Sequence, residues 1–93
     1  LAIAGLLAGA YLGIRDNLDP PSPLEGYGYD PSRADKLPGD LASALDAFEA
    51  DADLAGILGK QFVETFLTYK RNELERFHQW VTDWEFREYA YHL

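Results

Sequence analysis

The sequence predicts an all-α chain in which helices flank one long loop. Strong helix formers such as Ala and Leu dominate the segments on both sides of that loop. All five prolines fall within residues 19–39, where they exclude regular structure. No strand pattern is visible elsewhere. We therefore expect about four helices, near residues 2–16, 40–50, 60–81 and 83–91.

Composition and charge exclude several classes of function. Sixteen acidic against eight basic residues give a net charge of −8, so we expect neither a nucleic-acid partner nor an anionic membrane. The absence of cysteine excludes disulfides, thiolate metal sites and thiol nucleophiles. The chain begins with Leu1 instead of Met, inside an apolar run, and we expect it to be a segment of a longer protein.

Residues 1–18 form an apolar segment that has no polar face before Arg15. Its apolar run is shorter than the roughly 20 residues that a membrane-spanning helix needs. We interpret it as a core helix packed beneath a larger body, with a signal-peptide core or a membrane anchor as the alternatives. Gly5, Gly9 and Gly13 recur at every fourth position and form a flat stripe, which predicts close approach of another backbone.

Residues 19–39 predict an extended loop rich in proline and glycine. Loops longer than about 15 residues are usually functional or lie across a neighbouring surface. Tyr27 and Tyr29 are hydrophobic anchors that a free linker does not need. We therefore expect this loop to cross a larger body.

Residues 40–93 form a predicted helical region that opens with a short amphipathic helix. Asp40 is a suitable N-cap, and Leu41, Leu45 and Phe48 follow at helical spacing. A further helical turn, ended by Gly59 as a left-handed C-terminal residue, leads into the long helix. The nearby carboxylates are interpreted as a solvated acidic face rather than a magnesium site: Asp46, Glu49, Asp51 and Asp53.

The long helix at 60–81 and a shorter one after it complete the chain. Within the long helix, Arg71 and Glu75 are spaced to pair across one turn. Thr82 and Glu85 then form the pattern of a capping box, in which the hydroxyl caps the new helix and the carboxylate reaches back.

Aromatic side chains crowd the end of the chain. Nine of the thirteen aromatic residues lie after position 61, too many for a short helix to hide. We therefore expect a terminal tail that docks on a partner. The residues predicted to dock are Trp80, Trp84, Phe86, Tyr89 and Tyr91.

The residues themselves predict no catalytic, cofactor-binding or metal-binding site. The two histidines, His78 and His92, do not form a ligand pair of the H-x-x-x-H type. No glycine-rich phosphate loop is present either. The chain is therefore expected to pack and assemble rather than to catalyse.

Three segments nevertheless occur in an order that is typical of one family. They read AIAGLLAGAYLGIRDNLDPPSPLEG, KLPGDLASALDAFEADADLAGILG and FVETFLTYKRNELERFHQWVTDWEFREY. Together they resemble the C-terminal end of the glutamine synthetase family, and the last one closes like the γ-glutamylpolyamine synthetases, for example those that act on putrescine. The resemblance covers almost the whole chain and implies a helical C-terminal segment of a larger α+β ligase.

The resemblance also implies a reaction and a set of partners. Members of the family use ATP with Mg²⁺ or Mn²⁺ to form γ-glutamyl phosphate, which ammonia or a polyamine then attacks. The metal and substrate ligands lie upstream, so this segment is implied to be non-catalytic on its own. Implied partners are the upstream catalytic domain of the same cytoplasmic protein and further copies in a dodecamer, which the tail holds together.

Tyr29 stands where some bacterial members carry an adenylylated tyrosine, which makes it a candidate modification site. The alternative to a ligase segment is a stand-alone helical module for protein–protein interaction.

Overall fold

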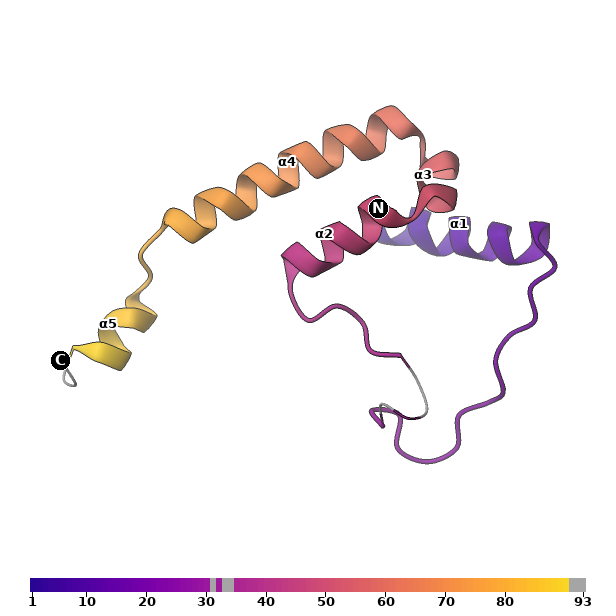
Figure 1. Ribbon diagram of the computed structural model, residues 1–93, viewed down its shortest axis with the longest axis horizontal. Helices are drawn as coiled ribbons and strands as arrows, with labels where there is room; N and C mark the ends of the chain where they lie inside the picture. The colour runs from indigo at the N-terminus through magenta and orange to yellow at the C-terminus, as the bar shows by residue number, and fades with distance from the viewer. Residues whose placement is uncertain (31, 33–34, 91–93) are drawn as a thin grey trace.

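The computed structural model describes residues 1–30, 32 and 35–90, and that part of the chain contains five helices and no strand. The helices are α1 (Ala2–Arg15), α2 (Leu41–Ala50), α3 (Ala52–Leu58), α4 (Lys60–Gln79) and α5 (Asp83–Tyr89). The long loop joins α1 to α2 (Figure 1). The all-α prediction is confirmed, and the predicted helical turn before the long helix is a separate helix, α3.

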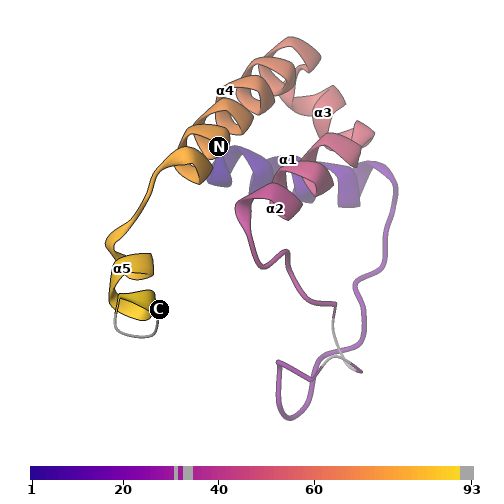
Figure 2. The same cartoon turned by 60° about the vertical axis from the view of Figure 1, so that its left-hand side comes forward.

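The core lies where α2, α3 and α4 meet (Figure 2). Leu45 of α2 and Val63 and Leu67 of α4 are 3%, 5% and 6% exposed. Phe48 and Phe66 pack against this cluster edge to face, with their ring centroids 5.9 Å apart. Apolar residues at helical spacing on two sequence-distant helices therefore bury each other, with α3 as the connection between them.

Two local signals fix the ends of these helices. The Asp40 carboxylate accepts a 2.7 Å hydrogen bond from the Ser43 N–H, which confirms the predicted N-cap of α2. Gly59 separates α3 from α4 with a φ of 102°, in the left-handed region that favours glycine. The chain can therefore reverse within one residue and lay α4 against α2.

The polar pairs of the second half differ from the prediction. Arg71 reaches across to α2, where it contacts Asp46, and the structure shows no pairing with Glu75 among the described residues. The Thr82 hydroxyl donates to the Glu85 carboxylate and makes no hydrogen bond to the helix backbone, so one half of the predicted capping box is wrong. The charge-assisted hydrogen bond turns the Thr82 hydroxyl toward the Glu85 carboxylate, and its oxygen accepts no hydrogen bond from a backbone N–H of α5.

The first helix packs on α3 along one narrow face. Ala8 is 4% exposed there, with Gly5 and Leu12 half-buried beside it. The other faces of α1 and the residue before it expose large apolar side chains by 50% or more: Leu1, Ile3, Leu6, Leu7, Tyr11 and Ile14. The other described helices thus leave most of this predicted core helix uncovered.

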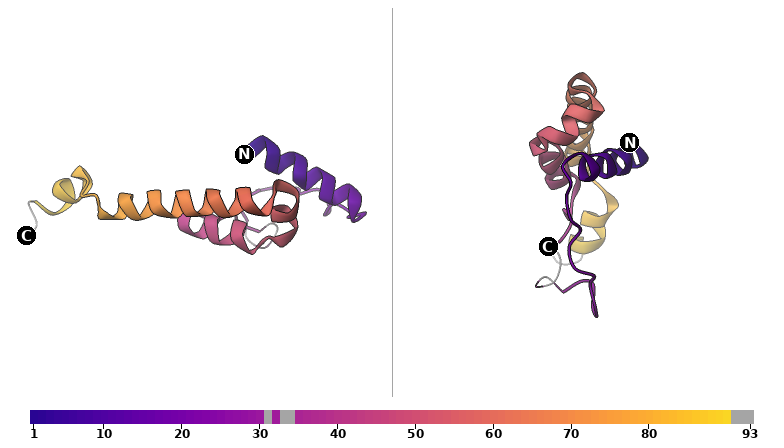
Figure 3. Two further views of the ribbon diagram at one scale, coloured as in Figure 1. Left: turned by 90° about the horizontal axis from the view of Figure 1, so that it is seen from above. Right: turned by 90° about the vertical axis from the view of Figure 1, so that its right-hand side faces the viewer.

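The overall shape is extended. Its Cα radius of gyration is 18.5 Å, whereas a compact domain of 93 residues has about 12 Å. The far half of α4 projects beyond α2, and α5 lies past the end of α4 (Figure 3). Within the described residues α5 packs on no other helix. The chain therefore presents long surfaces that its own helices do not cover.

We predict that Leu45→Ala destabilises the unit formed by α2, α3 and α4 by about 2–5 kcal/mol, because it opens a cavity in a small core. Leu41→Ala is the matched control: this leucine is 44% exposed, so its loss should cost less than about 1 kcal/mol. Urea unfolding followed by far-ultraviolet circular dichroism measures both. Equal losses would show that Leu45 does not hold the helices together.

We also predict that acid weakens α2 through its cap. The hydrogen bonds from Ser43 hold the pKa of Asp40 below its ordinary value of 3.8. Because the folded-state pKa is the lower one, the charged cap stabilises the helix above about pH 4, and this contribution disappears as the pH falls through the folded-state pKa. Circular dichroism between about pH 5 and pH 2 should show a loss of helix. The loss should be smaller in Asp40→Asn, which still caps but does not titrate; indistinguishable acid profiles would contradict the assignment.

Candidate docking surfaces

The glycine stripe of α1 makes no close contact within the described chain. Gly5 and Gly13 are half-buried and Gly9 is exposed. A Cβ atom added at any of the three would meet no atom within 4 Å. The close backbone approach that the sequence predicts at this stripe therefore has no partner among the described residues, and it stays a prediction about a second molecule or domain.

The aromatic tail is likewise open. Trp80, Trp84, Phe86 and Tyr89 are 73%, 58%, 69% and 48% exposed, while the fifth predicted docking residue, Tyr91, lies outside the described residues. The Trp84 and Tyr89 rings meet at 88°, with their centroids 5.9 Å apart. This edge-to-face contact is the favoured geometry for an aromatic pair.

Short-range polar contacts add modest support within α5. Arg87 pairs with Asp83 one turn earlier at 3.1 Å, and the Thr82 hydroxyl holds the pKa of the Glu85 carboxyl below its ordinary value. A helix of seven residues is marginal without such support or a partner. The tail is thus locally ordered while its aromatic rings stay accessible.

The loop presents a second aromatic pair. The rings of Tyr27 and Tyr29 lie 5.5 Å apart at 60°, and these residues are 71% and 85% exposed. The Asp30 carboxylate accepts hydrogen bonds from the Ser32 N–H and hydroxyl, which lowers the pKa of Asp30. Tyr29 is thus accessible to a modifying enzyme, and its modification stays a prediction.

Two arginines join helices across the fold, and the sequence reasoning missed both contacts. Arg71 of α4 contacts Asp46 at 3.1 Å and Glu49 at 3.6 Å, both on the acidic face of α2. The cluster of carboxylates on that face indicates that a basic residue could pair with it. It does not reveal which of the eight basic residues lies opposite.

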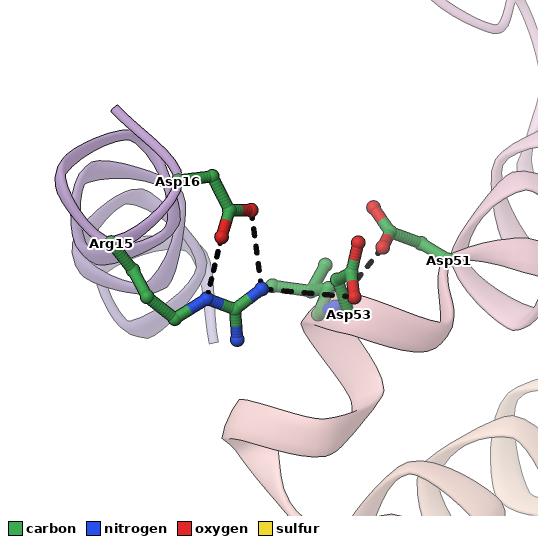
Figure 4. Close-up of polar contacts among 5 residues, drawn as sticks. Arg15, Asp16, Asp51 and Asp53 are labelled. Atoms are coloured by element: carbon green, nitrogen blue, oxygen red, sulfur yellow. Dashed lines mark hydrogen bonds and ion pairs between the residues drawn. The ribbon is translucent and has the colours of Figure 1, made fainter. Parts of the chain in front are cut away.

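The second arginine lies between α1 and α3 (Figure 4). Arg15 donates two hydrogen bonds to Asp16, at 2.8 and 3.1 Å, and reaches Asp53 at 3.9 Å. The hydrogen bond with Asp16 raises the pKa of Arg15 and lowers that of Asp16. Asp16 ends α1, where a negative charge opposes the helix dipole, so the arginine compensates for an unfavourable position.

The described residues contain no group of three or more His, Cys, Asp or Glu side chains that could hold a metal ion. His78 is exposed on α4, and His92 lies outside the described residues. None of the described helices has both the length and the apolar character needed to cross a membrane. The described residues instead present exposed apolar and aromatic side chains.

By its fold the chain is an all-α segment with large open apolar faces. Residues 1–89 match the family model described as "Glutamine synthetase, catalytic domain". The chain belongs to the glutamine synthetase family, which confirms the resemblance carried by the three ordered segments.

Curated relatives match over nearly the whole chain. The glutamine synthetase of Methanocaldococcus jannaschii is 36% identical over 96% of this chain, and that of Thermotoga maritima is 30% identical over 98%. A gamma-glutamylethanolamide synthetase of Streptomyces coelicolor is 34% identical over 94%. The matched region is 21%, 22% and 19% of these relatives, so the chain spans about a fifth of their length. No solved structure gave a significant match.

Proposed function

We propose that this chain is a packing and assembly segment of an ATP-dependent ligase that joins the γ-carboxylate of glutamate to an amine. The observation that carries the proposal is the match of residues 1–89 to the catalytic-domain family model. Such a ligase transfers a phosphoryl group to the carboxylate, and the amine then displaces phosphate from the activated acyl group.

The chain's own part in this proposal is structural. The described residues do not form a metal cluster, so they do not fit a role in holding Mg²⁺ or Mn²⁺ with ATP. We assign those ligands to the remainder of a longer cytoplasmic enzyme. In that enzyme the exposed apolar face of α1 packs against the upstream catalytic domain, which supplies the cover that the described helices do not provide.

The tail is proposed to dock on a neighbouring subunit of a homo-oligomer, for which the family resemblance implies twelve copies. Its exposed tryptophan and tyrosine are residue types that dominate binding energy at interfaces. A stand-alone helical interaction module is the alternative function, and the same open tail favours it. The family match over nearly the whole chain supports the ligase instead.

The amine substrate is proposed to be ammonia or a larger amine. Two of the relatives described above are named glutamine synthetase, and the third is named for ethanolamide formation. The closing sequence FHQWVTDWEFREY carries the proposed link to the polyamine branch.

We predict Mg²⁺-dependent release of ADP when the longer protein that carries this chain receives glutamate, ATP and the right amine. Ammonia, ethanolamine and putrescine are compared as substrates, and the γ-glutamyl product is identified by mass spectrometry. The 93-residue chain alone is the control and should release no ADP. Turnover by the chain alone, or no product with any amine, would contradict the proposal.

We further predict that Trp84→Ala and Tyr89→Ala each weaken assembly of that longer protein about tenfold or more, because truncation of an aromatic hot spot costs about 2 kcal/mol. Glu88→Gln, on the same short helix, is the control and should leave assembly unchanged. Analytical ultracentrifugation across a dilution series measures the effect. A tail that does not dock would leave all three variants with the wild-type oligomer.

A further inference from the structure

A row of aromatic side chains runs along one face of α4. It consists of Phe62, Phe66, Tyr69 and Phe77, and Glu73 fills the gap in the line. Steps of three and four residues keep these side chains on one face of the helix. Phe62, Tyr69 and Phe77 are 46%, 62% and 62% exposed. We call these five residues the α4 row.

The described helices leave this row largely uncovered. Among them α4 packs only on α2 and α3, which take up its Val63 and Leu67 face. Phe66, at the edge of that contact, is half-buried against Phe48, whereas Tyr69 and Phe77 lie farther along the helix. Figure 3 shows the last part of α4 extending past the end of α2.

A cation sits at the middle of the row. The Lys70 ammonium lies 5.8 Å from the centre of the Tyr69 ring and 6.0 Å from that of Phe66. It also pairs with Glu73 at 3.1 Å, and the two side chains are 33% and 48% exposed. Together with Lys70, the row therefore carries one positive and one negative charge close to its midpoint, with aromatic rings at both ends.

When it is reversed, this arrangement keeps like charges apart and aligns aromatic ends with each other; Phe66 then lies opposite Glu73, whose charge Lys70 already pairs. Phe62 and Phe77 are equally far from the midpoint between Tyr69 and Lys70, and so are Phe66 and Glu73. In an antiparallel pair of α4 helices, Phe62 of each copy faces Phe77 of the other. The Lys70 ammonium of each copy faces the Tyr69 ring of the other, as a cation–π contact. A parallel pair would instead bring lysine onto lysine and glutamate onto glutamate.

We propose that α4 pairs with α4 of a second copy, antiparallel, about a two-fold axis beside Tyr69 and Lys70. Such an interface is isologous, since each copy contributes the same patch. The proposal does not depend on the ligase activity, because it concerns contacts between two copies of this chain alone.

The area available for this pairing is small. An aromatic side chain buries about 150–250 Å², so the exposed parts of the row supply about 350 Å² per copy. Trp80 and Gly59 are equally far from the midpoint of the pair. Each tryptophan therefore lies opposite Gly59 of the other copy, which has no side chain to block the contact. With Trp80 the total for both copies is about 1,000 Å², at the low end of specific interfaces. The pair is therefore weak by itself and adds to other contacts in a larger assembly.

Disulfide trapping tests the pairing and its direction in the 93-residue chain, which has no cysteine of its own. Copies carrying Phe62→Cys are mixed with copies carrying Phe77→Cys and are mildly oxidised. We expect a crosslinked pair from the mixture and none from either variant alone, whereas Tyr69→Cys, beside the axis, crosslinks to itself. Glu64→Cys, on a different face of α4, is the control. Self-crosslinking of Phe62→Cys would show a parallel pair, and a mixture no more crosslinked than Glu64→Cys would show none; either result overturns the proposal.

A second measurement avoids engineered cysteines. Tyr69→Ala should weaken dimerisation about tenfold or more in sedimentation equilibrium, with circular dichroism verifying an unchanged helix content. Tyr11→Ala is the matched control on α1 and should change the dissociation constant less than about twofold. A larger effect of Tyr11→Ala than of Tyr69→Ala would place self-association on α1 and overturn the proposal.

Discussion

The fold depends on the contact between α2 and α4 around Leu45, Val63 and Leu67. These three side chains come from helices that Gly59 and the short α3 bring together, and they form the buried cluster of the described chain. So few buried side chains contribute only several kcal/mol, which the conformational entropy of the ordered residues largely offsets. The helical unit is therefore marginal by itself, and the surfaces around it determine how it is stabilised.

The exposed surfaces follow from this small core. A short chain cannot bury much of its apolar surface, and here the exposed apolar residues gather on α1, on the loop after it, along α4 and on the tail that follows α4. Contiguous apolar faces of this kind mark contacts with other protein surfaces. The chain belongs to the glutamine synthetase family, and the region it matches is about a fifth of its much longer relatives. In those relatives the matched region is therefore accompanied by further protein surface.

The sequence was sufficient for elements that depend on local chemistry. The Asp40 cap, the Gly59 turn and the amphipathic spacing of Leu45 and Phe48 each act within a few residues, and the structure confirms them. It was not sufficient where a side chain chooses between partners of similar distance. Arg71 bonds across the fold instead of along its helix, and Thr82 bonds a side chain instead of the backbone.

The candidate docking surfaces were likewise predictable from the sequence only in part. The excess of aromatic residues near the end of the chain can be counted in the sequence without knowledge of the fold. The packing of α1 on α3 beside Ala8, which leaves Gly5, Gly9 and Gly13 without a close backbone partner among the described residues, depends on tertiary structure that the local pattern does not encode. The length of α4 then explains why the tail stays open: twenty residues of helix extend for about 30 Å, and three residues join it to α5. Such a connection cannot return the tail to the core at the start of α4, and no other described helix packs on α5.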